Sequence, residues 1–318
     1  MVSYIVLSIT LFATLLFGAV GEIITEKSGH LNLGTPGIMC IGGIGGGYGI
    51  YLYSSMVGGV NNVNGFFVVL FGIVFALIFG ALAGLLYSFL TVTLRANQNI
   101  TGLTITTLGV GLANFMGKKF DLTVLSKTFQ YFQNLFHIGT DNDALRIFFS
   151  YGIMVYLGII IAILAILFLK KTKVGLELRA VGENPATADA TGISVSKYRY
   201  IATIVGSSIA ALGGLAYIMD FSSGKFDQAS SIEALGWLSV AIVIFSVWNP
   251  GICIFSSALF SFLFVLPTYV VATTADKELI KTISYVVTIV VLIITSIVGK
   301  RSVQPPAALG SNYFREDR

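Results

Sequence analysis

The chain has few charged residues and very few cysteines and histidines. Only 11% of its 318 residues are Asp, Glu, Lys or Arg, which is too little charge to cover a soluble protein of this length. Cys40 and Cys253 are far apart and indicate neither a disulfide framework nor a metal site, and His30 and His137 show no ligand spacing. No phosphate loop, HExxH, GxSxG or CxxC motif occurs, so the sequence excludes the common forms of covalent and metal catalysis and ATP hydrolysis by this chain.

Apolar sequence is abundant instead. Hydrophobic residues make up 55% of the chain, and several runs approach the roughly 20 residues that a helix needs to cross the membrane. We therefore predict an all-α, polytopic membrane protein with about eight to ten transmembrane helices. The fourth and seventh runs are short, which favours some broken or re-entrant helices. The apolar segments are 2–24, 31–53, 66–93, 100–116, 150–169, 199–221, 233–248, 251–269 and 282–299.

The first segment is interpreted as a membrane span and not as a secretion signal, because no basic stretch precedes its apolar core. No linker or repeat divides the chain, so 1–318 is predicted to be a single integral membrane domain. Loop charge predicts its orientation. If 170–199 faces the cytoplasm, that side carries 12 of the 19 lysines and arginines and the other side 7. The N-terminus is then outside, and the tail, 300–318, is cytoplasmic.

Residues 170–199 (KKTKVGLELRAVGENPATADATGISVSKYR), named here the polar island, lie between two apolar segments. Asn184 is a favourable N-cap, Pro185 suits the first helical position and Gly192 can end a helix, which predicts a two-turn helix over 185–191. Such a helix is too short to be stable alone in water. It is either part of a solvated loop or a small-faced helix that inserts into a groove of a partner protein.

A second polar stretch, 21–37 (GEIITEKSGHLNLGTPG), connects the first two apolar segments. It contains Glu22 and Asn32, and Pro36 predicts a break just inside the second span, because proline disfavours helix at the preceding residue. Broken helices at membrane depth often line transport pathways. This stretch is equally compatible with two interpretations. It either lines a transport pathway, or it is a turn followed by a kink that serves helix packing.

The stretch 94–107 (LRANQNITGLTITT) is rich in uncharged amides and hydroxyls. Such groups can bind a neutral polar solute without burying a charge, although threonines in helices also bond their own backbone. The candidates for a substrate pathway are Asn32, Asn97, Gln98, Thr101 and Thr104.

Small residues recur at four-residue spacing inside the apolar segments. Gly80 is followed by Gly84, and Gly206 by Ala210 and Gly214. Small residues at this spacing let membrane helices approach closely. We therefore expect these positions to serve helix packing.

Four stretches follow one another along the chain: GEIITEKSGHLNLG at 21–34, VGENPATADATGI at 181–193, the segment from Gly236-Trp237-Leu238 to Trp248-Asn249-Pro250, and QPPAALG at 304–310 with YFRE at 313–316. Together they resemble the permease subunit of a bacterial ABC importer, in the branch with ribose-type sugar, branched-chain amino-acid and nucleoside importers. The tail is most similar to the shorter permease of nucleoside importers. This family usually has an apolar residue followed by Glu at the positions that Thr35 and Pro36 occupy here. The chain therefore lacks the carboxylate that any Glu-dependent role at this site would need.

The resemblance implies a transport subunit and not an enzyme, located in the bacterial cytoplasmic membrane. It implies a separate cytoplasmic ATPase that binds the polar island and a second, related permease that forms a heterodimer with this chain. It also implies an extracytoplasmic solute-binding lipoprotein and a small polar substrate, foremost a nucleoside. No cofactor and no metal are expected. The residues expected to couple to the ATPase are Gly182, Glu183, Asn184, Pro185, Ala188 and Gly192.

Three alternatives stay open. The same architecture is compatible with import of a monosaccharide or a branched-chain amino acid. An ion-coupled secondary carrier would need ionisable groups deep in its spans, whereas Asp220 and Glu233 lie near the ends of predicted spans. An intramembrane enzyme would need paired catalytic groups, which the sequence does not show.

Overall fold

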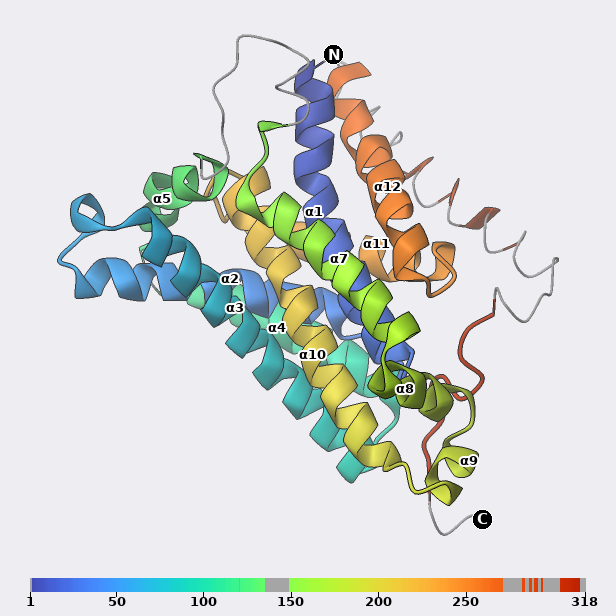
Figure 1. The fold of residues 1–318 in the computed structure, drawn as a ribbon. Helices are drawn as coiled ribbons and strands as arrows, with labels where there is room; N and C mark the ends of the chain where they lie inside the picture. The colour runs from blue at the N-terminus through green and yellow to red at the C-terminus, as the bar shows by residue number, and fades with distance from the viewer. Residues whose placement is uncertain are drawn as a thin grey trace.

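A computed structural model describes residues 2–119, 121–134, 149–270 and 304–314, with isolated positions between 282 and 293. Over these ranges the regular structure is entirely helical, as predicted (Figure 1). The ninth apolar segment, 282–299, lies mostly outside the described residues. The helices are α1 (Val2–Glu26), α2 (Thr35–Met56), η1 (Val60–Asn62), α3 (Gly65–Ser88), η2 (Phe89–Thr93), α4 (Gln98–Gly117), α5 (Thr123–Asn134), α7 (Ile153–Lys171), α8 (Lys173–Glu183), α9 (Pro185–Ala190), α10 (Val195–Ala216), η3 (Tyr217–Phe221), α11 (Ser230–Phe245) and α12 (Pro250–Val270).

Six of the described helical segments are long and apolar enough to cross a membrane: α1, α3 with η2, α4, α7, α10 with η3, and α12. The π-helical turns η2 and η3 continue α3 and α10 without a break. α11 is short, at 16 residues, as its apolar segment predicted. The fourth segment is longer than expected, because the polar residues before it join the helix and α4 reaches 20 residues.

Proline does not break the second span. α2 begins at Thr35, and Pro36 lies in its first turn, where the missing backbone N–H would have had no helical partner. The predicted break is therefore the start of the helix, and residues 27–34 form the turn that precedes it.

The residues between the fourth and fifth apolar segments contain a helix, α5. Asp121 accepts a hydrogen bond from the backbone N–H of Thr123 at 2.9 Å at its start, and Leu125 and Phe132 are fully buried. These two residues are seven apart and therefore lie on one helix face. α5 packs on α2, α3 and η3.

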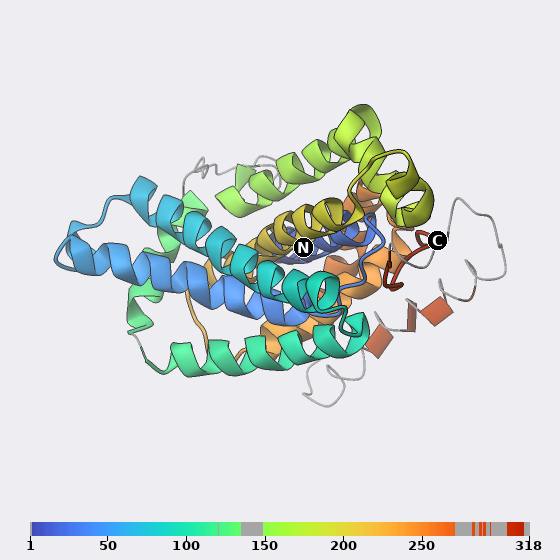
Figure 2. The ribbon, with the colours of Figure 1, turned by 90° about the horizontal axis from the view of Figure 1, so that it is seen from below.

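α10 packs against α1, α2 and α3 at the centre of the molecule, and Figure 2 shows α2, α3 and α10 side by side. The small residues make this packing possible, as predicted. A Cβ atom on Gly43 would lie 2.9 Å from the carbonyl carbon of Gly214, and one on Gly80 would lie 2.7 Å from the carbonyl oxygen of Ser207. Backbones in such close contact leave no room for larger residues.

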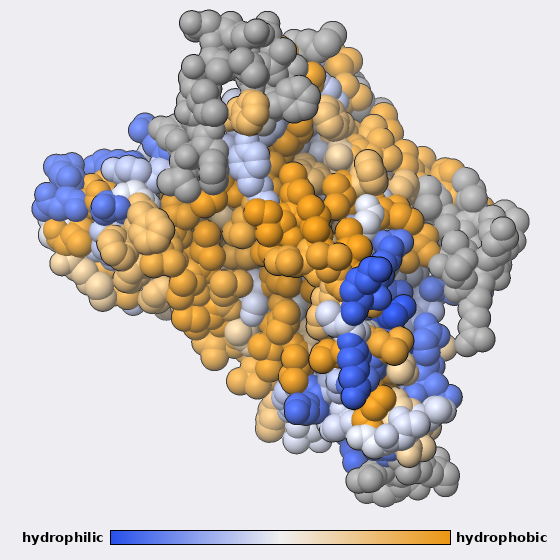
Figure 3. Space-filling view, in the orientation of Figure 1, coloured by the Kyte–Doolittle hydropathy of each residue, from blue (hydrophilic) through white to orange (hydrophobic). Residues whose placement is uncertain are grey.

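The face of the molecule seen in Figure 3 is apolar over most of the bundle, and polar residues collect around α8 and α9 and at the tip where α2 and α3 are joined. Among the exposed apolar side chains are Leu164 on α7 and Ile201 on α10, at 56% and 51% exposure. An apolar surface of this extent is compatible with lipid or with another membrane subunit. The N-terminus lies at the opposite end of the bundle from α8 and α9 (Figure 1).

Candidate functional site

The polar island folds into α8 and α9, and α9 is the helix that the sequence predicted. Asn184 Oδ1 accepts a hydrogen bond from the backbone N–H of Thr187 at 3.0 Å, and Pro185 occupies the first helical position. Gly192, at φ +88°, lies just after the end of α9 and adopts a backbone conformation that favours glycine. The predicted cap, start and stop are therefore confirmed, although the helix ends at Ala190.

α8 was missed in the sequence. Thr172 Oγ1 caps its start by accepting a hydrogen bond from the backbone N–H of Gly175 at 3.0 Å. Leu178 and Val181, three residues apart, are buried on one face. The capping threonine and the spacing of these apolar residues were the available signals.

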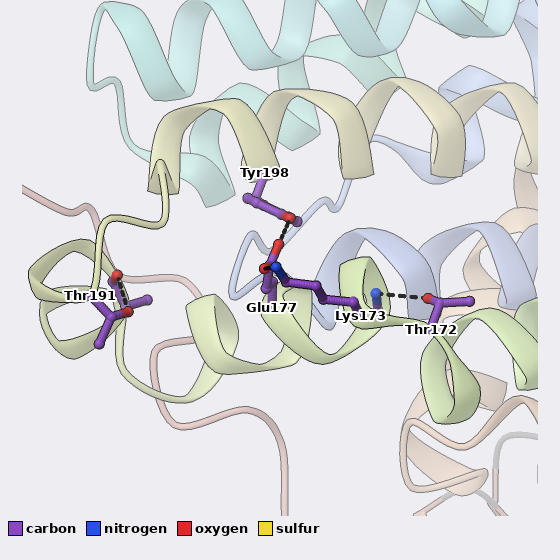
Figure 4. Close-up of polar contacts among 7 residues, drawn as sticks. Thr172, Lys173, Glu177, Thr191 and Tyr198 are labelled. Atoms are coloured by element: carbon purple, nitrogen blue, oxygen red, sulfur yellow. Dashed lines mark hydrogen bonds and ion pairs between the residues drawn. The ribbon is translucent and has the colours of Figure 1, made fainter.

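A polar contact fixes α8 to α10 (Figure 4). The phenol of Tyr198 on α10 donates a hydrogen bond to the carboxylate of Glu177 on α8. Lys173 Nζ lies 3.8 Å from Glu177 Oε1, but its side chain is 88% exposed, so this ion pair adds little stability. The hydrogen bond between the two helices is therefore the firmer connection.

The six coupling candidates differ in burial. Glu183, Asn184 and Gly192 are exposed, and Pro185 is half-buried. Gly182 and Ala188 are buried within this chain and are not open to a partner in this structure. The exposed residues at this end, named here the α9 rim, are Glu183, Asn184, Ala186, Thr187, Ala190, Thr191 and Gly192.

Ala188 packs in a small apolar cluster with Val181 of α8 and Val195 of α10. Ile193 and Tyr313, among others, cover the edge of this cluster. Ala188 is one of the residues expected to couple to the ATPase, but its methyl group packs inward against the two valines.

Gly182 joins three segments. A side chain at this position would collide with the carbonyl oxygen of Lys27, in the turn after α1. Its own carbonyl oxygen accepts a hydrogen bond from the backbone N–H of Ala308 in the tail at 3.0 Å. The backbone N–H of Gly310 donates to the carbonyl of Gly29 in the same turn at 3.2 Å. The first, second and fourth sequence motifs thus meet here.

The third motif reaches the same region through α1. The indole N–H of Trp248 donates a hydrogen bond to the buried carboxylate of Glu26. One turn earlier, Glu22 accepts hydrogen bonds from the hydroxyl of Thr35 and from the backbone N–H of Asn32, the latter at 3.2 Å. All four motifs therefore converge at the end of α1, which the sequence order alone did not show.

The turn after α1 is also held by buried polar side chains of α10. His30 Nδ1 lies 2.8 Å from Thr203 Oγ1, and Arg199 donates to the carbonyl oxygen of Ser311 at 3.0 Å. Burial, together with the positive charge of Arg199, lowers the pKa of His30 from 6.5 to about 3. His30 is therefore a neutral structural side chain at physiological pH.

The pathway candidates Asn32 and Gln98 serve the same junction. Gln98 accepts a hydrogen bond from the backbone N–H of Leu31 at 2.8 Å and donates to the side chain of Asn312 at 3.1 Å. Asn32 is 1% exposed, and its Oδ1 accepts from the backbone N–H of Gly34 at 3.0 Å. Neither side chain faces an open surface in this structure.

The other three candidates lie at or in α4. Asn97 is exposed and caps the helix by accepting from the backbone N–H of Ile100 at 3.1 Å, and Thr101 is buried. Thr104 is exposed and donates to the carbonyl oxygen of Ile100 at 2.8 Å. Thr107 and Gly111 continue the exposed face of α4 along the next turns.

The described residues contain no group of three or more His, Cys, Asp and Glu side chains that could hold a metal ion. Cys40 and Cys253 are buried free thiols. A multi-pass helical bundle that presents a small capped helix at one end is compatible with the membrane subunit of a transporter.

The comparisons with known proteins identify the kind of transporter. The chain belongs to the family described as the permease component of the branched-chain amino acid transport system, which it matches over residues 4–296. It is thus the permease of an ABC importer, and a separate ATPase hydrolyses the ATP.

Three relatives show the range within this family. The chain is 32% identical to a nucleoside ABC transporter permease of Lactococcus lactis, covering 98% of this chain and 96% of the relative. It is 30% identical to a putative glucose ABC transporter permease of Haloferax volcanii, covering 95% and 94%. A guanosine ABC transporter permease of Bacillus subtilis is also 30% identical, covering 77% of each chain.

A solved structure has a similar fold. It is an inward-facing conformation of a putative metal-chelate type ABC transporter, with a TM-score of 0.50 and 13% sequence identity. The match covers 92% of this chain and 85% of the other. It supports the ABC permease fold and says nothing about the substrate.

Proposed function

We propose that this chain forms half of the translocation pathway of an ABC importer for nucleosides. The observation that carries the substrate class is the 32% identity to the Lactococcus lactis nucleoside permease along 98% of the chain. The tail motif, which resembles the shorter permease of nucleoside importers, supports it. A sugar importer is the second candidate, because the putative glucose permease of Haloferax volcanii is 30% identical over a similar length.

The α9 rim is the proposed contact with the ATPase. It is exposed, yet Ala188 ties α9 to the rest of the chain, and the hydrogen bond between Glu177 and Tyr198 ties the adjoining α8 to α10. Gly182 ties the same region to the turn after α1. A displacement of the rim by the ATPase is thereby passed to α1 and α10, which pack extensively against each other.

The exposed face of α4 is the proposed wall of the pathway. It carries the hydroxyls of Thr104 and Thr107, and Gly111 adjoins open space. These hydroxyls bond their own helix at 2.8 and 3.1 Å and keep lone pairs that can accept hydrogen bonds from a polar solute. The second, related permease of a heterodimer would supply the opposite wall.

The proposed orientation places α8, α9 and the tail in the bacterial cytoplasm and the N-terminus outside. The division of the lysines and arginines, 12 against 7, supports this placement. The solute-binding lipoprotein would then deliver substrate to the end of the bundle that carries the N-terminus.

Uptake measurements test the substrate class. Cells that express the complete transporter should accumulate labelled guanosine or uridine, and excess unlabelled nucleoside should abolish the uptake. Excess glucose or leucine serves as the matched competitor and should leave it unchanged. Uptake that responds to glucose or leucine and not to nucleosides would reject the nucleoside assignment while leaving the transporter class intact.

A charge reversal tests the coupling contact. Glu183→Arg changes an exposed residue of the α9 rim, so the permease should still insert and fold but lose the ATPase during purification. Asp121→Arg makes the same charge change at an exposed residue beside α5 and should retain the ATPase. Full retention of the ATPase and of transport by the Glu183 variant would contradict the proposed contact.

A further inference from the structure

A cavity of about 380 Å³ lies at the end of the molecule opposite α8 and α9. It is formed where the start of α1, the end of α12, α5 and η3 meet, together with the residues just before α7. It is remote from the α9 rim and from the turn after α1. None of the four sequence motifs contributes to it.

Asp220 of η3 is the charged residue of this cavity. Its side chain is 3% exposed, and neither carboxylate oxygen has a hydrogen-bond partner in the part of the chain that the structure describes. Its backbone carbonyl accepts a hydrogen bond from Gln133 Nε2 at 3.0 Å, which fixes the backbone and leaves the carboxylate without a donor. Burial of a carboxylate without a partner is costly, so such a group in a membrane protein indicates a ligand or a functional role.

The surroundings of Asp220 keep space open for its carboxylate. A Cβ atom on Gly152 would lie 2.6 Å from Oδ2 and 2.8 Å from Oδ1, so a side chain at this position would displace the carboxylate. Asp220 lies in a π-helical turn, a rare conformation that is frequent at functional sites. The aromatic residues Phe221 and Tyr269 line the same cavity.

The remaining lining residues define the ligand class. Ser3, Thr10 and Ser223 contribute hydroxyls, which can accept hydrogen bonds from N–H groups. Aromatic rings attract cations over their faces. The volume of about 380 Å³ is more than ten times the roughly 30 Å³ that one water molecule occupies in the liquid, which is far more than a bare alkali ion needs.

We propose that this cavity binds a small organic cation, an ammonium or guanidinium group, through a charge-assisted hydrogen bond to Asp220. The cation is either a free amine or a lysine or arginine side chain of another protein at this end. The site is separate from the proposed wall on α4, and it does not depend on the identity of the transported substrate.

Binding is tested with the full-length chain in lipid nanodiscs. Labelled methylammonium should bind, and unlabelled methylammonium should displace it while equal concentrations of sodium or potassium should not. Saturating methylammonium should raise the melting temperature by roughly 2 °C or more. Equal displacement by sodium would overturn the assignment to an organic cation, and no binding at all would overturn the site.

Two variants locate the binding. Asp220→Asn keeps the shape of the side chain and should abolish both the binding and the thermal shift, whereas Asp227→Asn, at an exposed acid in the next loop, should preserve both. Gly152→Ala retains Asp220 but fills the space beside it, and binding should fall at least tenfold. Unchanged binding in Gly152→Ala and Asp220→Asn would overturn the site, and the direct measurement on the native chain decides the case if a variant does not fold.

The source of the cation is distinguished in the assembled transporter. Loss of methylammonium binding when the extracytoplasmic binding protein is docked would identify a side chain of that partner as the occupant. Binding that persists in the assembly would identify a free amine. Both results require that the isolated chain binds methylammonium first.

Discussion

Trp248 and Glu26 are 222 residues apart in sequence, and the indole N–H of the first donates a hydrogen bond to the carboxylate of the second. Glu26 is the last residue of α1, and Trp248 lies in the turn between α11 and α12. Both residues are buried. This contact joins two sequence motifs and fixes the end of α1, next to the turn on which α8 and the tail pack.

Trp248→Phe should therefore destabilise the protein. An aromatic ring is retained but the indole N–H is lost, which removes one hydrogen bond of the buried Glu26 carboxyl group and costs about 1.5–3 kcal/mol. Thermal unfolding of the purified chain measures the loss. Trp237→Phe, the same change at a half-buried tryptophan of α11, should have a smaller effect. If both variants melt alike, the hydrogen bond contributes nothing specific.

Gly182→Val should disrupt the junction between α8, the turn after α1 and the tail. The new Cβ would collide with the carbonyl oxygen of Lys27, so either the turn or α8 must move. We expect a lower yield of folded protein and loss of the ATPase during purification. Gly111→Ala is the control, because a Cβ there meets nothing within 4 Å and alanine favours helix by up to about 1 kcal/mol. Normal ATPase binding by Gly182→Val would contradict the described packing.

His30 should make stability depend on pH. Its pKa is about 3 in the folded chain and 6.5 in the reference state, so the unfolded chain takes up the proton first. Stability from this residue is therefore complete above pH 6.5 and is lost as the pH falls from about 6.5 towards 3. At about pH 5 the loss is about 2 kcal/mol.

Melting temperatures between about pH 7.5 and 5 measure this effect. His30→Asn keeps a polar side chain opposite Thr203 but takes up no proton in this range. Its melting temperature should fall less steeply with acidification than that of the native chain. Parallel slopes for the two proteins would show that His30 does not remain neutral on folding.

Tyr198→Phe should weaken coupling more than stability. The phenol hydroxyl donates to Glu177 at a partly exposed position, so its loss costs only about 1 kcal/mol. The hydrogen bond between α8 and α10 is lost, however, and we expect lower uptake per ATP hydrolysed in reconstituted vesicles. Tyr200→Phe, two residues further along α10, is the matched control. An unchanged ratio of transport to hydrolysis would exclude this connection from the coupling path.

Much of the fold followed from local sequence. The apolar runs predicted the membrane helices, and Asn184, Pro185 and Gly192 predicted α9, because caps and breakers act within a few residues. The inward position of Ala188 could not be predicted, since it depends on Val181 and Val195 in two other helices. The internal role of Gln98 was hidden for the same reason, because its partners Leu31 and Asn312 are distant in sequence.

The central claim is that the α9 rim contacts the ATPase, and site-specific photo-crosslinking tests it most directly. A photoreactive residue at Thr187, which is exposed on the rim, should crosslink in intact cells to a protein that carries a phosphate-binding loop. The same residue at Asp121, which is exposed beside α5 in a separate part of the fold, should not. Crosslinking of the ATPase from Asp121 and not from Thr187 would contradict both the coupling assignment and the proposed orientation.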